Sequence, residues 1–193
     1  MQAWADAQRQ ENVRKYIDHN VACFQSGVPR HLYAGVYEIR QTSAYIIILS
    51  EEAHAYRIVT MDGRPHIGKD ILLFQGDSRG RWEGNTLVVD TTSQNAKVFL
   101  DQRGRFFTEA ARVVERLTMI EGDTIHYEAT IEDPLVYTRP FTIAFPLRRD
   151  TQEGFEIWED SCHEGEQDVN ILRRLGYKIY PGISAKEARE RAR

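Results

Sequence analysis

Short alternating runs of apolar and polar residues, separated by turns, occupy the chain from about residue 33 to residue 159. Successive side chains of a β-strand point to opposite faces, so this period of two predicts half-buried strands. Two turns, EGNT at 83–86 and EGDT at 121–124, nearly repeat, and Gly followed by Asn or Asp suits a tight hairpin. The expected strands are VYEIRQ, SAYIIILS, HAYRIVTM, RWEG, NTLVVDTT, ARVVERLTMI, TIHYEATI, FTIAFPLRR and GFEIWED.

Hairpin-linked strands with almost no helix between them predict a mainly β protein with a single antiparallel, calycin/lipocalin-like β-barrel. Closure of a barrel removes the exposed edges of such a sheet, and an eight-stranded barrel has room for a small ligand. A two-sheet sandwich is the alternative. We expect three regions: an N-terminal helical extension (1–22), the barrel (23–165) and a C-terminal helical tail (166–193). Within the tail, Ser184 and Glu187 predict the cap of a final short helix.

Composition excludes several classes of partner. The 193 residues carry a net charge of −4 without a basic stripe, so no nucleic-acid partner is expected. The longest purely apolar run, residues 44–49, is too short to span a bilayer, and no membrane partner is expected.

The N-terminus has no basic segment followed by an apolar one, so no signal peptide is predicted. The chain is then either cytosolic or a mature form with an added Met1.

Some predicted strands carry an ionisable group among apolar neighbours. His54 shares a face with Tyr56, whereas Arg57 lies on the opposite face of the same strand. Asp90 beside Val88 and Glu115 between Val113 and Leu117 occupy comparable positions in later strands. If these faces line the interior, burial shifts the pKa values and supplies a cavity with an acid or a base. Cross-strand ion pairing on the outer face is the alternative, and the sequence leaves it open.

The stretch SCHEGEQD concentrates a cysteine, a histidine and two glutamates. On an extended segment Cys162 and His163 point to opposite sides, which argues against a catalytic dyad. The chain has two cysteines and no HxH or HExxH spacing, so no metal site is predicted. A disulfide between Cys23 and Cys162 would tie the start of the barrel to the end of its last strand. We predict this bridge if the protein matures outside the cytosol.

Several long motifs resemble those of a large group of poorly characterised bacterial proteins, many of them exported. The resemblance covers about residues 22–166, and its motifs are DGRPH (62–66), GDSRGRWEG (76–84), EDP (132–134), YTRP (137–140) and CHEG (162–165). Relatives commonly have GVPR after a cysteine, as residues 23–30 do here, which supports the disulfide. The resemblance therefore implies an exported, periplasmic or secreted barrel-like module rather than a particular reaction.

The function expected from these patterns is cofactor-independent acid/base chemistry on an apolar small molecule, by a lyase, isomerase or cyclase, including a pericyclase. No phosphate-binding loop, Rossmann fingerprint or nucleophile elbow is present, and no cofactor is predicted. The predicted catalytic residues are His54, Tyr56, Arg57, Glu115, Glu128 and Arg139. The predicted substrate-binding residues are His66, Asp77, Arg81, Trp82, Tyr127, Tyr137 and His163. The alternatives are a non-catalytic ligand carrier with the same barrel and a structural or interaction role, and self-association into a homo-oligomer is left open.

Overall fold

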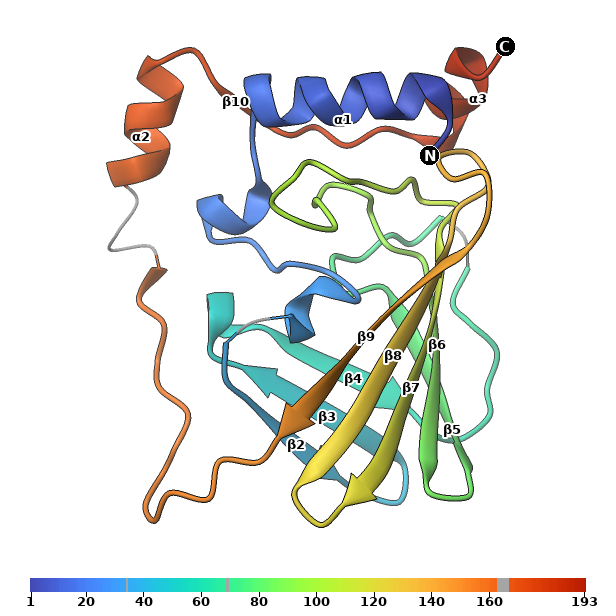
Figure 1. Ribbon diagram of the computed structural model, residues 1–193, viewed down its shortest axis with the longest axis vertical. Coiled ribbons are helices and arrows are strands. Elements are labelled where there is room, and N and C mark those ends of the chain that lie inside the picture. Colours follow the sequence, from blue (N-terminus) through green and yellow to red (C-terminus); the bar gives the residue numbers. More distant parts are fainter. Residues whose placement is uncertain (34, 69, 163–166) are drawn as a thin grey trace.

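An eight-stranded sheet dominates the computed structural model, which describes residues 1–33, 35–68, 70–162 and 167–193 (Figure 1). The strands follow one another in the sheet in chain order, and all neighbours are antiparallel except β4 and β5. They are β2 (Tyr37–Gln41), β3 (Tyr45–Ser50), β4 (Tyr56–Thr60), β5 (Asp77–Glu83), β6 (Thr86–Thr92), β7 (Arg112–Glu121), β8 (Thr124–Glu132) and β9 (Phe141–Arg148). The predicted mainly β class and the two predicted hairpins are therefore confirmed.

The sheet curls into a half-barrel and does not close. Its edges are β2 and β9, which have no pairing with each other among the described residues. The Arg149 N–H donates to the Asp123 carbonyl, and this register turns the backbone nitrogen of Pro146 away from β8. Proline lacks an N–H, so this edge of β9 presents one donor fewer to a closing strand. The predicted antiparallel barrel, closed or nearly closed, is thus corrected to an open half-barrel with one short parallel step.

Apolar side chains on the concave face of the sheet form the main core. Opposite residues of paired strands share a face, and the buried positions follow the period of two that the sequence shows. The central members of this core from the sheet are Ile46, Ile48, Val59, Leu87, Val89, Val113, Leu117, Tyr127, Ala129 and Ile131. Short 3-10 turns, η1 (His19–Ala22), η2 (Arg30–Leu32) and η3 (Glu52–His54), connect the terminal segment and the strands.

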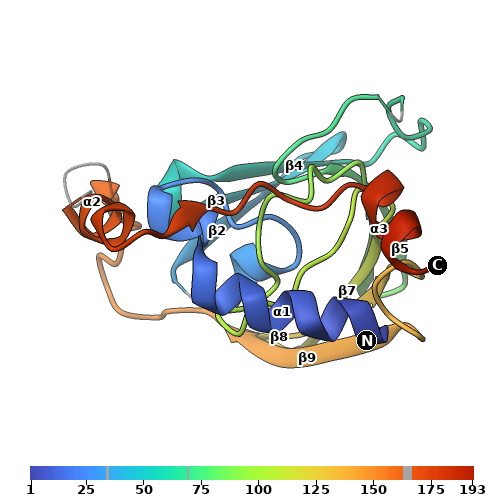
Figure 2. The same ribbon diagram turned by 90° about the horizontal axis from the view of Figure 1, so that it is seen from above.

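The terminal segments cover one end of the half-barrel together. Helix α1 (Ala3–Lys15) crosses that end, and both chain termini lie beside it (Figures 1 and 2). Strand β1 (Tyr16–Ile17) pairs in parallel with β10 (Lys178–Ile179), which joins the two terminal segments. The remaining helices are α2 (Gln167–Arg174) and α3 (Ala185–Arg191). None of the helices in the described ranges is both long and apolar enough to cross a membrane.

Local helix signals are confirmed at α3, where the Ser184 Oγ accepts a hydrogen bond from the Glu187 N–H at 3.1 Å. The predicted strand GFEIWED is wrong, because residues 154–160 form no strand. This segment instead makes isolated hydrogen bonds to the connection between β3 and β4. The Trp158 N–H donates to Glu51 Oε1 at 2.6 Å, and Asp160 Oδ2 accepts from the Ala53 N–H at 2.9 Å.

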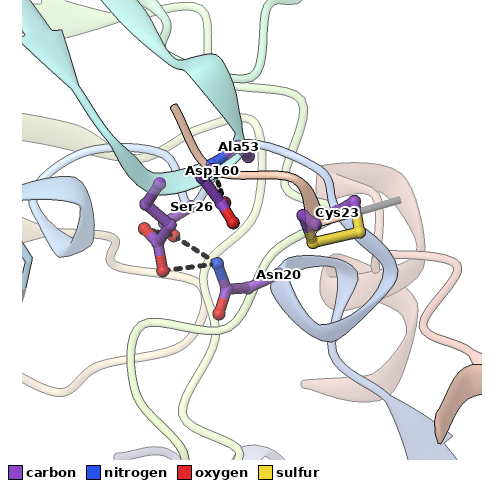
Figure 3. The surroundings of a disulfide bond; sticks show 7 residues. Asn20, Cys23, Ser26, Ala53 and Asp160 are labelled. Atoms are coloured by element: carbon purple, nitrogen blue, oxygen red, sulfur yellow. Dashed lines mark hydrogen bonds between the residues drawn. A yellow bond between two sulfur atoms is a disulfide. The ribbon is translucent and has the colours of Figure 1, made fainter. Parts of the chain in front are cut away.

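The predicted disulfide is present between Cys23 and Cys162, which are 139 positions apart in the sequence (Figure 3). It holds the segment after β9 against the N-terminal segment. Beside it, the Asn20 side-chain amide donates to Ser26 Oγ at 3.0 Å and to Glu52 Oε1 at 2.7 Å. The bridge and the contacts of Trp158 and Asp160 hold the end of residues 149–162, and the hydrogen bond from Arg149 to Asp123 holds its start.

Candidate ligand-binding site

A cleft of about 830 Å³ lies between the two free edges of the sheet. Its lining includes Arg40, Gly122 and Asp123, so it lies toward the end of the half-barrel that carries the β2–β3 and β7–β8 turns. The β5–β6 turn is at the same end, which we call the mouth (Figure 1). The strands place apolar side chains on the inner wall of this mouth cleft, since their alternation turns every second residue toward the interior. These are Tyr37, Ile39, Met119, Ile125 and Leu147.

Charged residues and a non-strand segment form the rim of the mouth cleft. Arg40 pairs with Glu38, and Arg149 Nε lies 3.5 Å from Asp123 Oδ1, so these rim charges are compensated. Residues 155–157 contribute the apolar side chains of Phe155 and Ile157 next to the β2 edge. The cleft thus has an apolar wall and a polar, solvent-exposed rim.

Deeper in the half-barrel, a hydrogen-bonded polar network centres on the Arg57–Glu115 ion pair. Their side chains are 2% and 0% exposed, and Arg57 Nη1 donates to Glu115 Oε1 at 2.9 Å. Arg57 also donates to Ser78 Oγ at 2.9 Å and to Thr91 Oγ1 at 2.8 Å. The Tyr127 hydroxyl donates to Glu115 Oε1 at 2.8 Å, and burial, followed by the charge of Glu115, raises the Tyr127 pKa well above its usual value.

This network unites three predicted site residues, Arg57, Glu115 and Tyr127. These residues have no access to the mouth cleft, because neither Glu115 nor Tyr127 lines it. The guanidinium and carboxylate neutralise each other, and their hydrogen-bonding groups are occupied by protein partners. Buried charges of this kind are retained when they are paired and hydrogen-bonded, so the network can be explained as a structural element of the interior.

His31 lies in η2 and is a buried residue that was not among the predicted site residues. Neither ring nitrogen has a hydrogen-bond partner among the described residues. Burial, together with the nearby charge of Arg57, holds the His31 pKa well below its usual value. A neutral imidazole therefore sits close to the buried ion pair.

The remaining predicted catalytic residues lie outside the concave interior. The His54 side chain is half-exposed at the η3 turn, with Nε2 3.7 Å from Glu159 Oε1. Tyr56 is 60% exposed on the outer face of β4. Glu128 faces outward beside His126, and Arg139 is exposed in the β8–β9 connection. The structure therefore does not bring the six predicted catalytic residues together around one cavity.

Two predicted substrate-binding residues, His66 and Asp77, belong to a charged cluster on the outer face of β5, β6 and β7. His66 Nδ1 lies 2.7 Å from Asp77 Oδ2, and Arg79 Nη2 lies 2.9 Å from Asp77 Oδ1. Arg112 makes a bidentate pair with Asp90 at 2.8 and 2.7 Å. Hydrogen bonding from Arg112 is the main cause that lowers the Asp90 pKa. This is the cross-strand ion pairing that sequence analysis left as the alternative.

The other predicted binding residues are dispersed. Arg81 pairs with Glu83 on the exposed face, and Trp82 is half-exposed near the β5–β6 turn. Tyr137 is buried away from the mouth, where its hydroxyl donates to the Phe106 carbonyl at 2.8 Å and burial raises its pKa. His163 lies outside the described residues.

Sequence reasoning missed the residues that form the mouth cleft. The alternation places Ile125 on one face of its strand, but only the curvature of the sheet and the position of its edges turn this face into a cleft wall.

Within the described ranges, no group of three or more His, Cys, Asp or Glu side chains is arranged to hold a metal ion. Comparison of the chain with protein-family models, with curated proteins and with solved structures found no match in any of the three.

Proposed function

We propose that the protein binds an apolar small molecule in the mouth cleft and releases it unchanged. The observation that carries this proposal is a cleft of about 830 Å³ with apolar side chains on its inner wall and charges on its rim. Small-molecule sites are concave, mostly apolar and about 300 to 1,000 Å³ in volume. The ligand class that fits such a wall is a largely apolar molecule with a polar end at the rim.

Binding without turnover is favoured over acid/base catalysis by the position of the ionisable groups. Glu115 is sealed behind protein atoms and neutralised by Arg57, while His54 and Tyr56 lie outside the concave interior. A general acid or base must reach its substrate directly or through one water molecule. None of the six predicted catalytic residues lines the mouth cleft.

We also propose that the protein works outside the cytosol. Disulfides persist in oxidising compartments and are rare in cytosolic proteins. The Cys23–Cys162 bridge and the resemblance to exported bacterial proteins both support this location.

The test is a fluorescence titration with the neutral apolar probe N-phenyl-1-naphthylamine. Ile39→Glu places a carboxylate on the apolar wall, where a bound apolar molecule would exclude its water, so we expect at least a tenfold loss of affinity. Ile120→Glu is the matched control, because Ile120 is an exposed isoleucine near the same end of the sheet and does not line the cleft. A probe that does not bind the wild-type protein, or that binds the Ile39→Glu and Ile120→Glu variants with equal affinity, would contradict the proposal.

A further inference from the structure

The main sheet has a gap between β4 and β5. These strands pair only through Val59 with Ser78 and Thr60 with Arg79. The first three residues of β4, Tyr56 to Ile58, have a strand partner on the β3 side only. A strand in the middle of the sheet therefore has a free edge over part of its length.

The backbone register shows which groups this edge presents. The Ser50 N–H donates to the Ala55 carbonyl at 2.8 Å, and the Met61 N–H donates to the Ala44 carbonyl at 2.9 Å. In an antiparallel pair the residues bonded to the partner alternate, so Arg57 directs its backbone to β3, whereas the Tyr56 backbone groups and the Ile58 N–H point into the gap. Among the described residues, neither the Tyr56 N–H nor the Ile58 N–H donates a backbone hydrogen bond outside the sheet, and neither residue is paired with β5.

A pocket of about 560 Å³ opens onto this free edge, and several of its lining residues are exposed and apolar. Tyr56 and Ile58 contribute from β4, while Phe24 and Leu73 contribute from the segments on either side. Phe24 stacks on Phe74 with ring centroids 5.5 Å apart, which gives the pocket an aromatic wall. Apolar residues gathered in this way around a concave site mark a binding surface more often than isolated ones do.

We propose that the β4–β5 gap binds an extended peptide segment, which adds to the free edge of β4 as a strand. Backbone N–H and C=O groups carry alternating partial charges, and the main chain of an extended peptide is complementary to that alternation. The added strand continues the pairing that β4 already makes with β5 at Val59 and Thr60. Its outward apolar side chains pack beside Tyr56, Ile58 and Phe24.

Hydrogen exchange and calorimetry test this proposal with the synthetic peptide acetyl-Lys-Thr-Val-Phe-Val-Thr-Lys-amide. In the free protein we expect fast amide exchange at Tyr56 and Ile58 and slow exchange at Arg57, which is bonded to β3. Saturating peptide is expected to slow exchange at Tyr56 and Ile58 at least tenfold. Slow exchange at both amides in the free protein, or no binding at millimolar peptide, would overturn the proposal.

The variant Ile58→Pro removes the N–H that faces the gap and no hydrogen bond to β3, since proline is tolerated where a strand's N–H is unpaired. We expect at least tenfold weaker peptide binding. Ala144→Pro is the matched control, because it removes an N–H from the free edge of β9, a strand that already contains Pro146. Thermal unfolding verifies that both variants are folded. Undiminished binding to Ile58→Pro, or equal binding of an N-methylated peptide, would show that apolar contacts alone are recognised and would refute strand addition.

Discussion

Removal of the Glu115 carboxylate is expected to be among the most destabilising single changes in this protein. Arg57 would keep its hydrogen bonds to Ser78 and Thr91 but would be left as an uncompensated charge at a position that is 2% exposed. The Tyr127 hydroxyl would also lose its acceptor. Breaking a buried ion pair by removing one partner costs about 3 to 5 kcal/mol. In a protein of this size, that corresponds to a decrease in Tm of roughly 6 to 20 °C.

Urea unfolding followed by circular dichroism measures this loss for Glu115→Ala. The double variant Arg57→Met/Glu115→Leu is expected to lose less than Glu115→Ala, because it removes both charges and refills the space with apolar atoms. Asp90→Ala is the comparison on the outer face, where the arginine partner is 54% exposed, and its expected cost is below about 1 kcal/mol. A loss below about 1 kcal/mol for Glu115→Ala, or a double variant less stable than Glu115→Ala, would refute the reasoning.

Two further predictions concern acid sensitivity and the disulfide. The folded-state pKa of His31 is depressed, so as the pH falls the unfolded chain binds a proton before the folded protein does. The stability that comes from a neutral His31 is therefore fully present above about pH 6.5 and is lost as the pH falls. His31→Leu should therefore gain stability relative to the wild type between pH 7.5 and pH 5 in paired urea titrations, whereas a constant difference would contradict the assignment. The double variant Cys23→Ser/Cys162→Ser should lose about 4 to 5 kcal/mol on the chain-entropy model for a loop of this length. Intact-mass analysis after alkylation checks the bridge itself, and two modified thiols in the unreduced protein would disprove it.

Local patterns in the sequence identified most strands because alternation, hairpin turns and helix caps depend on neighbouring residues. The Ser184 cap is one example, and the strand from Thr124 to Glu132 is another. The same local signal misassigned residues 154–160, which alternate like a strand but pair with no strand among the described residues, although Phe155 and Ile157 lie next to the free edge of β2. Alternation thus reports the capacity to form a strand, whereas pairing decides the outcome.

The sequence by itself determined that Tyr56 and Arg57 lie on different sides of one strand, and that Cys23 and Cys162, its two cysteines, are the pair that can form a disulfide. Which side faces inward was decided by the curvature of the whole sheet, which buries Arg57 against Glu115 across 58 positions of sequence. The open seam between β2 and β9, the gap beside β4 and the joining of the two chain ends by β1 and β10 also depend on tertiary structure. The physical reason is that a period of two sorts side chains into two faces locally, while burial is conferred only by residues far apart in the chain.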